Sequence, residues 1–128
     1  MKILLVEDDP SIREALREIL EMEKHQCTEV ADGLLATEIL KKSTAFDLLI
    51  TDFRMPNING AELLGWCRKN AIHFPVIFIT ADRELLHFEK IALSDCCAVL
   101  LRKPIHVVEL LTAISDSQIR NHNRHFKD

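Results

Sequence analysis

The stretch Ile3–Pro10, ILLVEDDP, joins four apolar residues directly to three acidic ones. The apolar run is typical of a strand buried inside a domain. Glu7, Asp8 and Asp9 follow at once, and their carboxylates repel one another where that strand ends. Such a cluster is costly beside a protein interior unless a positive charge lies among the carboxylates. The stretch therefore predicts a buried strand whose carboxyl end needs a cation.

The rest of the chain repeats this order, a short apolar run followed by an amphipathic stretch. Strands are predicted at residues 2–6, 27–31, 46–51, 74–80 and 97–101. Helices are predicted at residues 12–20, 33–42, 59–70, 82–95 and 106–114, where apolar residues recur at helical spacing. Because the apolar runs do not alternate with polar residues, the strands suit a parallel sheet covered on both faces. Right-handed crossovers then give an α/β domain with a doubly wound, five-stranded parallel sheet and five helices.

Length and composition narrow the class of protein. The 128 residues suit one domain at 1–119, and the polar segment 120–128 is either a tail or the start of a linker. A net charge of −4 provides no overall basic field, which argues against direct binding of nucleic acid. No apolar run reaches the length of a membrane span, and the N-terminus lacks a signal-peptide pattern. The four cysteines form no C-x-x-C pair, so we expect buried free thiols in a reducing cytoplasm.

Polar residues that follow the predicted strands point to a site. In open α/β sheets, ligands bind beyond the carboxyl ends of the strands. The polar residues at or just after the carboxyl ends of the predicted strands are Glu7, Asp8, Asp52, Thr80 and Lys103. If the fold is as predicted, these side chains meet along one edge of the sheet.

The chemistry of this set suits phosphoryl transfer. Carboxylate oxygens are ligands that Mg²⁺ prefers, and Mg²⁺ commonly keeps waters and takes phosphate oxygens as well. The hydroxyl of Thr80 and the ammonium of Lys103 suit phosphoryl oxygens. An aspartate can itself be the nucleophile and form an acyl phosphate. The set therefore predicts a Mg²⁺-dependent phosphoryl site.

Each residue also has an ordinary structural interpretation. Asp9 and Pro10 suit a helix start, with Asp as the N-cap and Pro at the first helical position, and we prefer that role for Asp9. Asp52 alone suits a turn, and Thr80 or Asp82 suits the cap of the following helix. These interpretations leave the clustering at strand ends unexplained.

Four segments together resemble a known family. VEDDP, LLITDFRMPNINGAELL, VIFITA and LRKPI are similar, in order and spacing, to the receiver domain of two-component response regulators. The resemblance covers roughly residues 1–119 and implies the flavodoxin-like receiver fold. It implies a signalling switch rather than a metabolic enzyme, phosphorylated by a sensor histidine kinase or a phosphotransfer protein.

The resemblance also assigns roles to particular residues. It makes Asp52 the phosphoacceptor, and Thr80 and Lys103 the groups that contact the phosphoryl oxygens. Asp8 is expected to bind Mg²⁺ directly and Glu7 through a water, with Asp52 and the backbone carbonyl of Arg54 completing the protein ligands. In the family the bond between the positions of Lys103 and Pro104 is typically cis.

Three departures from the family pattern fall near the predicted fourth helix, fifth strand and fifth helix. Leu100 stands where an aromatic switch residue is usual, Cys96 and Cys97 replace a Gly-Ala pair, and Ile105 replaces a common Phe. They motivate an alternative, a degenerate receiver that acts as an interaction module without phosphorylation. A flavodoxin-like cofactor carrier is set aside, because acids follow the first strand and the chain has no Tyr.

A partner surface is predicted on the fourth helix. Its apolar residues spread over more than one helical face, so some are expected to stay exposed. They are Leu85, Leu86, Phe88, Ile91 and Leu93. This surface, with the fifth strand and fifth helix, is expected to bind a second copy of the chain or an output domain. The alternative is that these apolar residues all pack against the core over a wide contact of the helix.

Overall fold

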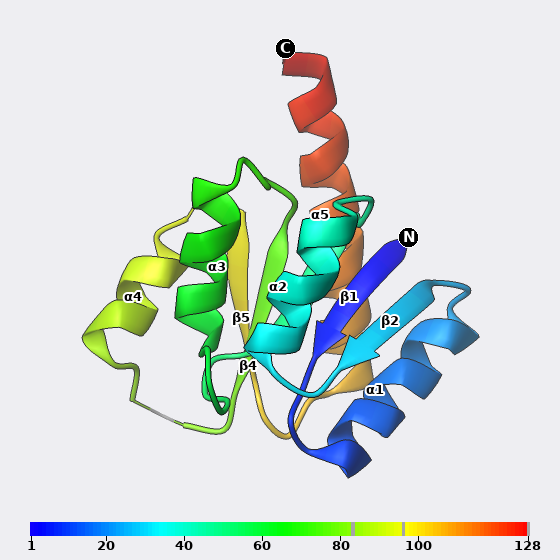
Figure 1. Ribbon diagram of the computed structural model, residues 1–128. Coiled ribbons are helices and arrows are strands. Elements are labelled where there is room, and N and C mark those ends of the chain that lie inside the picture. The colour runs from blue at the N-terminus through cyan, green and yellow to red at the C-terminus, as the bar shows by residue number, and fades with distance from the viewer. Residues whose placement is uncertain (83, 96, 128) are drawn as a thin grey trace.

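The computed structural model describes residues 1–82, 84–95 and 97–127, with the side chains of residue 88 and of residues 119–127 left aside. The five strands are β1 (Lys2–Val6), β2 (Gln26–Val30), β3 (Leu48–Asp52), β4 (Val76–Thr80) and β5 (Ala98–Arg102). The five helices are α1 (Pro10–Met22), α2 (Gly33–Lys42), α3 (Gly60–Lys69), α4 (His87–Leu93) and α5 (Val107–Lys127). The strands pair in parallel in the order β2-β1-β3-β4-β5 (Figure 1). The predicted doubly wound α/β fold is confirmed.

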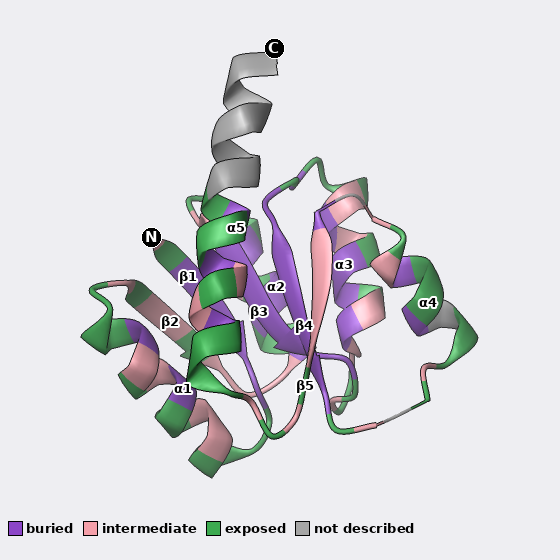
Figure 2. Cartoon of the chain, turned by 180° about the vertical axis from the view of Figure 1, so that it is seen from behind, coloured by how far each residue is buried: buried purple, intermediate pink, exposed green. Residues whose placement is uncertain are grey.

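Helices cover both faces of the sheet (Figures 1 and 2), and an apolar cluster lies between the sheet and the helices on each face. Leu4 and Val6 of β1 face one cluster, which also holds buried residues of α2, α3 and α4. Ile3 and Leu5 face the other, which holds buried residues of α1 and α5. Successive side chains of a strand point to opposite faces, so a strand covered on both sides must be apolar throughout. This is why the apolar runs of the sequence do not alternate.

Local side-chain caps start three of the helices. The Asp9 carboxylate accepts hydrogen bonds from the backbone N–H groups of Ser11 (2.9 Å) and Ile12 (3.2 Å), with Pro10 opening α1. The predicted cap role of Asp9 is confirmed. Asp32 caps α2 in the same way. Asn59 and Glu62 form a reciprocal capping box at α3, so Asn59 is a helix cap as well as a loop residue.

The fourth helix is shorter than predicted. Residues 82–95 were expected to be helical, whereas α4 begins at His87 and ends at Leu93. Asp82 is held outside the helix, since its N–H donates to the hydroxyl of Thr80 (3.1 Å) and its carbonyl accepts from Arg102 (2.6 Å). The ordinary structural interpretation, in which Thr80 or Asp82 caps this helix, is therefore wrong, because Leu86 occupies the N-cap position.

The last helix is longer than predicted. It was expected over residues 106–114, but α5 continues to Lys127. The predicted boundary after residue 119 falls within α5, and the division into a domain and a polar tail stays a prediction.

Cys27 and Cys67 are free thiols, and Cys67 is buried as expected, whereas Cys27 is only partly buried. Burial raises the pKa of Cys27 and of Cys67 to about 11, so both remain protonated at neutral pH. Cys96 lies outside the described residues. Within the described ranges, no helix combines the length and the apolar character needed to cross a membrane.

Candidate phosphoryl and metal site

The five residues found at predicted strand ends lie together in space. Asp52 and Thr80 are the last residues of β3 and β4, while Glu7, Asp8 and Lys103 follow β1 and β5 directly. Backbone hydrogen bonds between neighbouring strand ends hold this edge in register. Lys103 N–H donates to the Thr80 carbonyl at 2.7 Å, and Glu7 N–H donates to the Val30 carbonyl at 3.1 Å. The parallel sheet thus brings side chains from distant parts of the chain to one edge.

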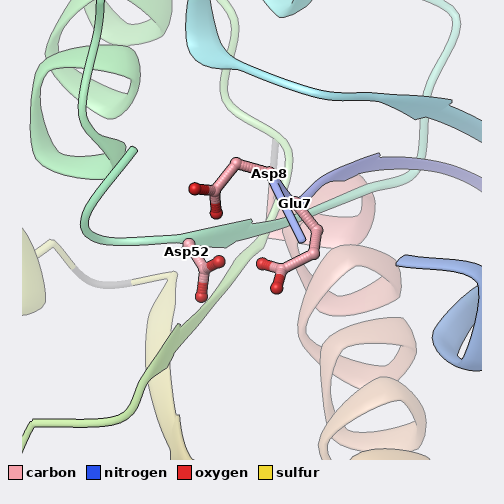
Figure 3. Close-up of side chains that lie close together, drawn as sticks. All are labelled: Glu7, Asp8 and Asp52. Atoms are coloured by element: carbon pink, nitrogen blue, oxygen red, sulfur yellow. The ribbon is translucent and has the colours of Figure 1, made fainter. Parts of the chain in front are cut away.

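Three carboxylates share this edge. One oxygen from each of Glu7, Asp8 and Asp52 lies within 4.8 Å of the others, and Figure 3 shows the three side chains around one space. Glu7 is 1% exposed and Asp52 is 4% exposed, whereas Asp8 is exposed to solvent. The repulsion anticipated from ILLVEDDP therefore includes Asp52, while Asp9 is occupied as the cap of α1.

The ammonium of Lys103 lies among these carboxylates. Its Nζ is 3.0 Å from Oδ1 and 3.2 Å from Oδ2 of Asp52, and 3.2 Å from Oε1 of Glu7. The bond from Lys103 to Pro104 is cis. Burial raises the pKa of Asp52, although the hydrogen bond and positive charge of Lys103 act in the opposite direction. Lys103 thus supplies one of the positive charges that we expected among the carboxylates following the first strand.

The carboxylate cluster fits a divalent metal ion as well. Lys103 supplies one positive charge for three carboxylates, so the cluster keeps an excess of negative charge. The buried Oε2 of Glu7 has no hydrogen-bond partner in the described part of the chain. An all-oxygen donor set with an unsatisfied buried oxygen suits Mg²⁺, which accepts carboxylates and retains waters. Glu7, Asp8 and Asp52 are the side chains that could hold such an ion.

A small cavity opens beside Asp52. Its volume is about 110 Å³, and its lining includes Asp8, Asp52, Arg54, Thr80 and Lys103. The buried Thr80 hydroxyl accepts the Asp82 N–H and keeps its own hydrogen for another acceptor. The cavity therefore offers a carboxylate nucleophile, a hydroxyl and an ammonium to one small anion.

The side chain of Arg54 joins this cavity to α4. Its Nη1 lies 2.5 Å from Oδ2 of Asp82, and its Nε and Nη2 donate to the two oxygens of Glu89 at 3.2 and 3.1 Å. Hydrogen bonds to Glu89 chiefly raise the pKa of Arg54, which stays charged. Glu89 is 0% exposed and was not found from the sequence. The sequence offered one signal for a buried acid here, namely a single carboxylate among the mostly apolar residues of LLHFEKIAL.

The predicted partner surface is partly exposed. Leu86 is 47% and Ile91 is 58% exposed, which confirms that some apolar residues of this segment face solvent. Leu85 and Leu93 instead pack against the cluster that includes α3 and α4, and the side chain of Phe88 lies outside the described residues. Leu100, at the position usual for an aromatic switch, packs against the same cluster.

Comparisons with known proteins agree with this geometry. The family profile described as the response regulator receiver domain matches residues 3–115. Response regulator protein FleR from Pseudomonas aeruginosa is 41% identical over 118 residues, 89% of this chain and 24% of FleR. Chemotaxis protein CheY-3 from Vibrio cholerae is 38% identical over 87 residues, 66% of each protein. A segment of the sensor histidine kinase RcsC from Salmonella typhimurium is 35% identical over 82 residues, 64% of this chain and 8% of RcsC. The chain thus spans about a quarter of FleR.

Solved structures share the fold. The receiver domain of the Francisella response regulator 1452 has a TM-score of 0.80 at 27% identity, covering 93% of this chain and 97% of that one. The chemotaxis protein CheY4 from Vibrio cholerae has a TM-score of 0.79 at 26% identity, covering 91% of this chain and 97% of that one.

Proposed function

The chain belongs to the response regulator receiver domain family, and from that premise we propose that Asp52 accepts a phosphoryl group from a histidine kinase. The supporting observation is the position of the Asp52 carboxylate. It lies against the ammonium of Lys103 and close to the carboxylates of Glu7 and Asp8, beside a cavity lined by Thr80. No other described cluster of acidic side chains has this arrangement of oxygen donors.

In the proposed transfer, a carboxylate oxygen of Asp52 attacks the phosphorus of a phosphohistidine. The new P–O bond forms as the P–N bond breaks, and the electron pair of that bond returns to the imidazole nitrogen, which takes up a proton from water. Lys103 stabilises negative charge on the phosphoryl oxygens, and Thr80 donates a hydrogen bond to one of them. Later attack of water on phosphorus regenerates the Asp52 carboxylate and releases inorganic phosphate.

Mg²⁺ completes the proposed site. Asp8, Asp52 and the backbone carbonyl of Arg54 would hold the ion, with Glu7 behind a water. When bound, Mg²⁺ would neutralise the excess of carboxylate charge that otherwise repels a phosphoryl group. The unsatisfied Oε2 of Glu7 supports this assignment, because a metal-bound water would give that oxygen a donor.

The domain is proposed to act as a switch rather than a metabolic enzyme, although it assists its own phosphorylation and dephosphorylation. Its partner is a sensor histidine kinase or a phosphotransfer protein. The similarity to a segment of the sensor histidine kinase RcsC supports a kinase-linked role. Free thiols at Cys27 and Cys67 are consistent with a reducing cytoplasm, where we place the domain.

The proposed output surface is formed by α4, β5 and α5. Leu86 and Ile91 expose apolar area there, and so do Val107 and Val108 of α5, at 48% and 76%. Exposed apolar side chains of this kind suit a contact with another protein. A second copy of the chain or an output domain is the proposed partner of this surface.

A phosphorylation-independent interaction module is the second candidate. Leu100 favours it, because a leucine at this position has neither the ring nor the hydroxyl of the usual aromatic residue. One experiment distinguishes the two candidate functions: the protein is incubated with acetyl phosphate and Mg²⁺, and its intact mass is then measured. A phosphoacceptor gains one phosphoryl group at Asp52, whereas an interaction module gains none.

A further inference from the structure

The carboxylate of Glu89 is buried in α4 and paired with the residue two positions after Asp52. Glu89 is 0% exposed, and its two oxygens accept from Nε and Nη2 of Arg54 at 3.2 and 3.1 Å. Its Oε1 also accepts the N–H of Leu86 at 2.8 Å, which closes the first turn of α4. Among the described residues, Arg54 is the cation found against this carboxylate. One guanidinium therefore neutralises Glu89 and connects α4 to the loop after β3.

Arg54 also faces the cavity in which the phosphoryl group would sit. The cavity is lined by Arg54 together with Asp52, Thr80 and Lys103. The Arg54 side chain is 41% exposed, so it has room to turn towards the cavity. A phosphoryl group carries about two negative charges at neutral pH, and the planar guanidinium matches its oxygens well. The phosphoryl group would thus compete for one guanidinium with the two carboxylates already bound to it, those of Glu89 and Asp82.

The consequences for α4 follow from the burial of Glu89. A buried carboxylate that loses its cation is strongly destabilising, because the charge stays away from water without compensation. Glu89 can regain solvation if the first turn of α4 moves outwards. The first turn has little to hold it apart from Glu89, because α4 has only seven residues, the side chain of its N-cap residue Leu86 offers no hydrogen-bond acceptor, and Leu86 and Ile91 are exposed. Leu100 lacks the ring of the usual aromatic residue at this position, so a connection between α4 and the site would have to use other residues.

We propose that the Arg54–Glu89 ion pair is a latch between the phosphorylation site and α4. A phosphoryl group on Asp52 draws Arg54 away from Glu89, and the first turn of α4 then leaves its buried position. Glu89 is a positioning residue in this scheme, acting through Arg54. The latch rests on the proposed phosphorylation of Asp52 and adds a route by which the event reaches the exposed apolar residues of α4.

The test compares the affinity for beryllofluoride, a phosphoryl analogue, in the presence of Mg²⁺. Glu89→Gln keeps the shape and the oxygen that accepts from Leu86 but removes one of the two carboxylate charges that hold Arg54, leaving that of Asp82. We expect this variant to bind beryllofluoride about tenfold more tightly than the wild type, a typical size for coupling between two sites. Glu84→Gln is the matched control, because Glu84 contacts Arg54 through its backbone carbonyl and its side chain is exposed. The double variant Arg54→Ala with Glu89→Gln should bind as Arg54→Ala alone does.

A second measurement uses the wild type only and does not depend on the folding of any variant. Exchange of the Leu86 amide hydrogen, which is bound to Glu89, should become at least about tenfold faster when beryllofluoride and Mg²⁺ are added. Equal affinity of Glu89→Gln and wild type, or a Leu86 amide whose exchange is unchanged by loading, would overturn the latch while leaving the proposed function intact. Failure of the wild type to bind beryllofluoride at all would instead contradict the proposed function, and the latch with it.

Discussion

The ammonium of Lys103 lies 3.0 Å from Oδ1 of Asp52, although Asp52 ends β3, Lys103 follows β5, and β4 lies between these two strands. Lys103 reaches Glu7 as well, at 3.2 Å. Two buried carboxylates therefore share one cation, at the edge of the sheet where a phosphoryl group is proposed to bind. Substitutions that remove one of these charges should therefore change the free energy of unfolding by a measurable amount.

Lys103→Met should destabilise the fold. Glu7 is 1% exposed, and without Lys103 it becomes a buried charge with no cation against it among the described residues. We expect a loss of about 3 kcal/mol in the free energy of unfolding, measured by urea denaturation without Mg²⁺. Adding Glu7→Gln should recover part of the loss, because the charge is then removed. Lys42 is exposed, and Lys42→Met should change the free energy of unfolding by less than about 0.5 kcal/mol. A Lys103→Met variant as stable as Lys42→Met would contradict this charge balance.

Asp52→Asn should stabilise the fold at neutral pH in the absence of Mg²⁺. The pKa of Asp52 is raised in the folded state, chiefly by burial, so its protonated form favours folding. That contribution is present below the unfolded pKa and is lost as the pH rises through the folded pKa. The neutral Asn avoids the loss, and we expect a gain of about 1–3 kcal/mol at pH 7. Denaturation curves at a series of pH values should show the gain shrinking in acid, and a variant less stable than wild type at pH 7 would count against a raised pKa.

Mg²⁺ should raise the thermal stability of the wild type through Asp8. At a Mg²⁺ concentration about 100 times the dissociation constant, one site stabilises the fold by about 2.7 kcal/mol. Asp8→Asn should lose most of this response in a thermal melt. Asp9→Asn is the matched control, because Asn is as good a helix cap as Asp, and the carboxylate of Asp9 caps α1. Equal responses of the two variants would exclude Asp8 as the principal ligand.

Gly60→Ala should disturb the backbone that presents Asp52. A Cβ at Gly60 would fall well inside van der Waals contact of the Asp52 carbonyl oxygen, whereas a Cβ at Gly65 in the same helix meets nothing within 4 Å. We expect Gly60→Ala to cost about 2 kcal/mol or more. Gly65→Ala should instead stabilise the fold by about 0.5–1 kcal/mol, because Ala favours the helix. Urea denaturation of both variants tests the difference, and equal effects would show that the close approach at Gly60 carries no cost.

Most of the fold was predictable because its signals are local. Apolar runs without alternation indicated strands covered on both faces, and the two clusters on opposite faces of the sheet bear this out. The principle that parallel strands end at one edge was enough to bring Glu7, Asp52 and Lys103 together. Asp9 was separable from its neighbours because the cap of a helix depends only on the next few residues.

What the sequence did not reveal depends on distant partners. Asp82 was predicted inside a helix, but Thr80, Arg102 and Arg54 each bind it and hold it outside α4. Glu89 was predicted to be helical, yet its burial depends on the guanidinium of Arg54, 35 positions away. Neither contact can be predicted from the residues that neighbour Asp82 or Glu89 in the sequence.

The central claim is that Asp52 accepts a phosphoryl group, and intact mass measurement after incubation with acetyl phosphate tests it most directly. With Mg²⁺ present, the wild type should gain the mass of one phosphoryl group, and the gain should disappear when a chelator removes the metal. Asp52→Asn should gain nothing under the same conditions. A wild type that gains no mass, or an Asp52→Asn variant that gains as much as the wild type, would contradict the account.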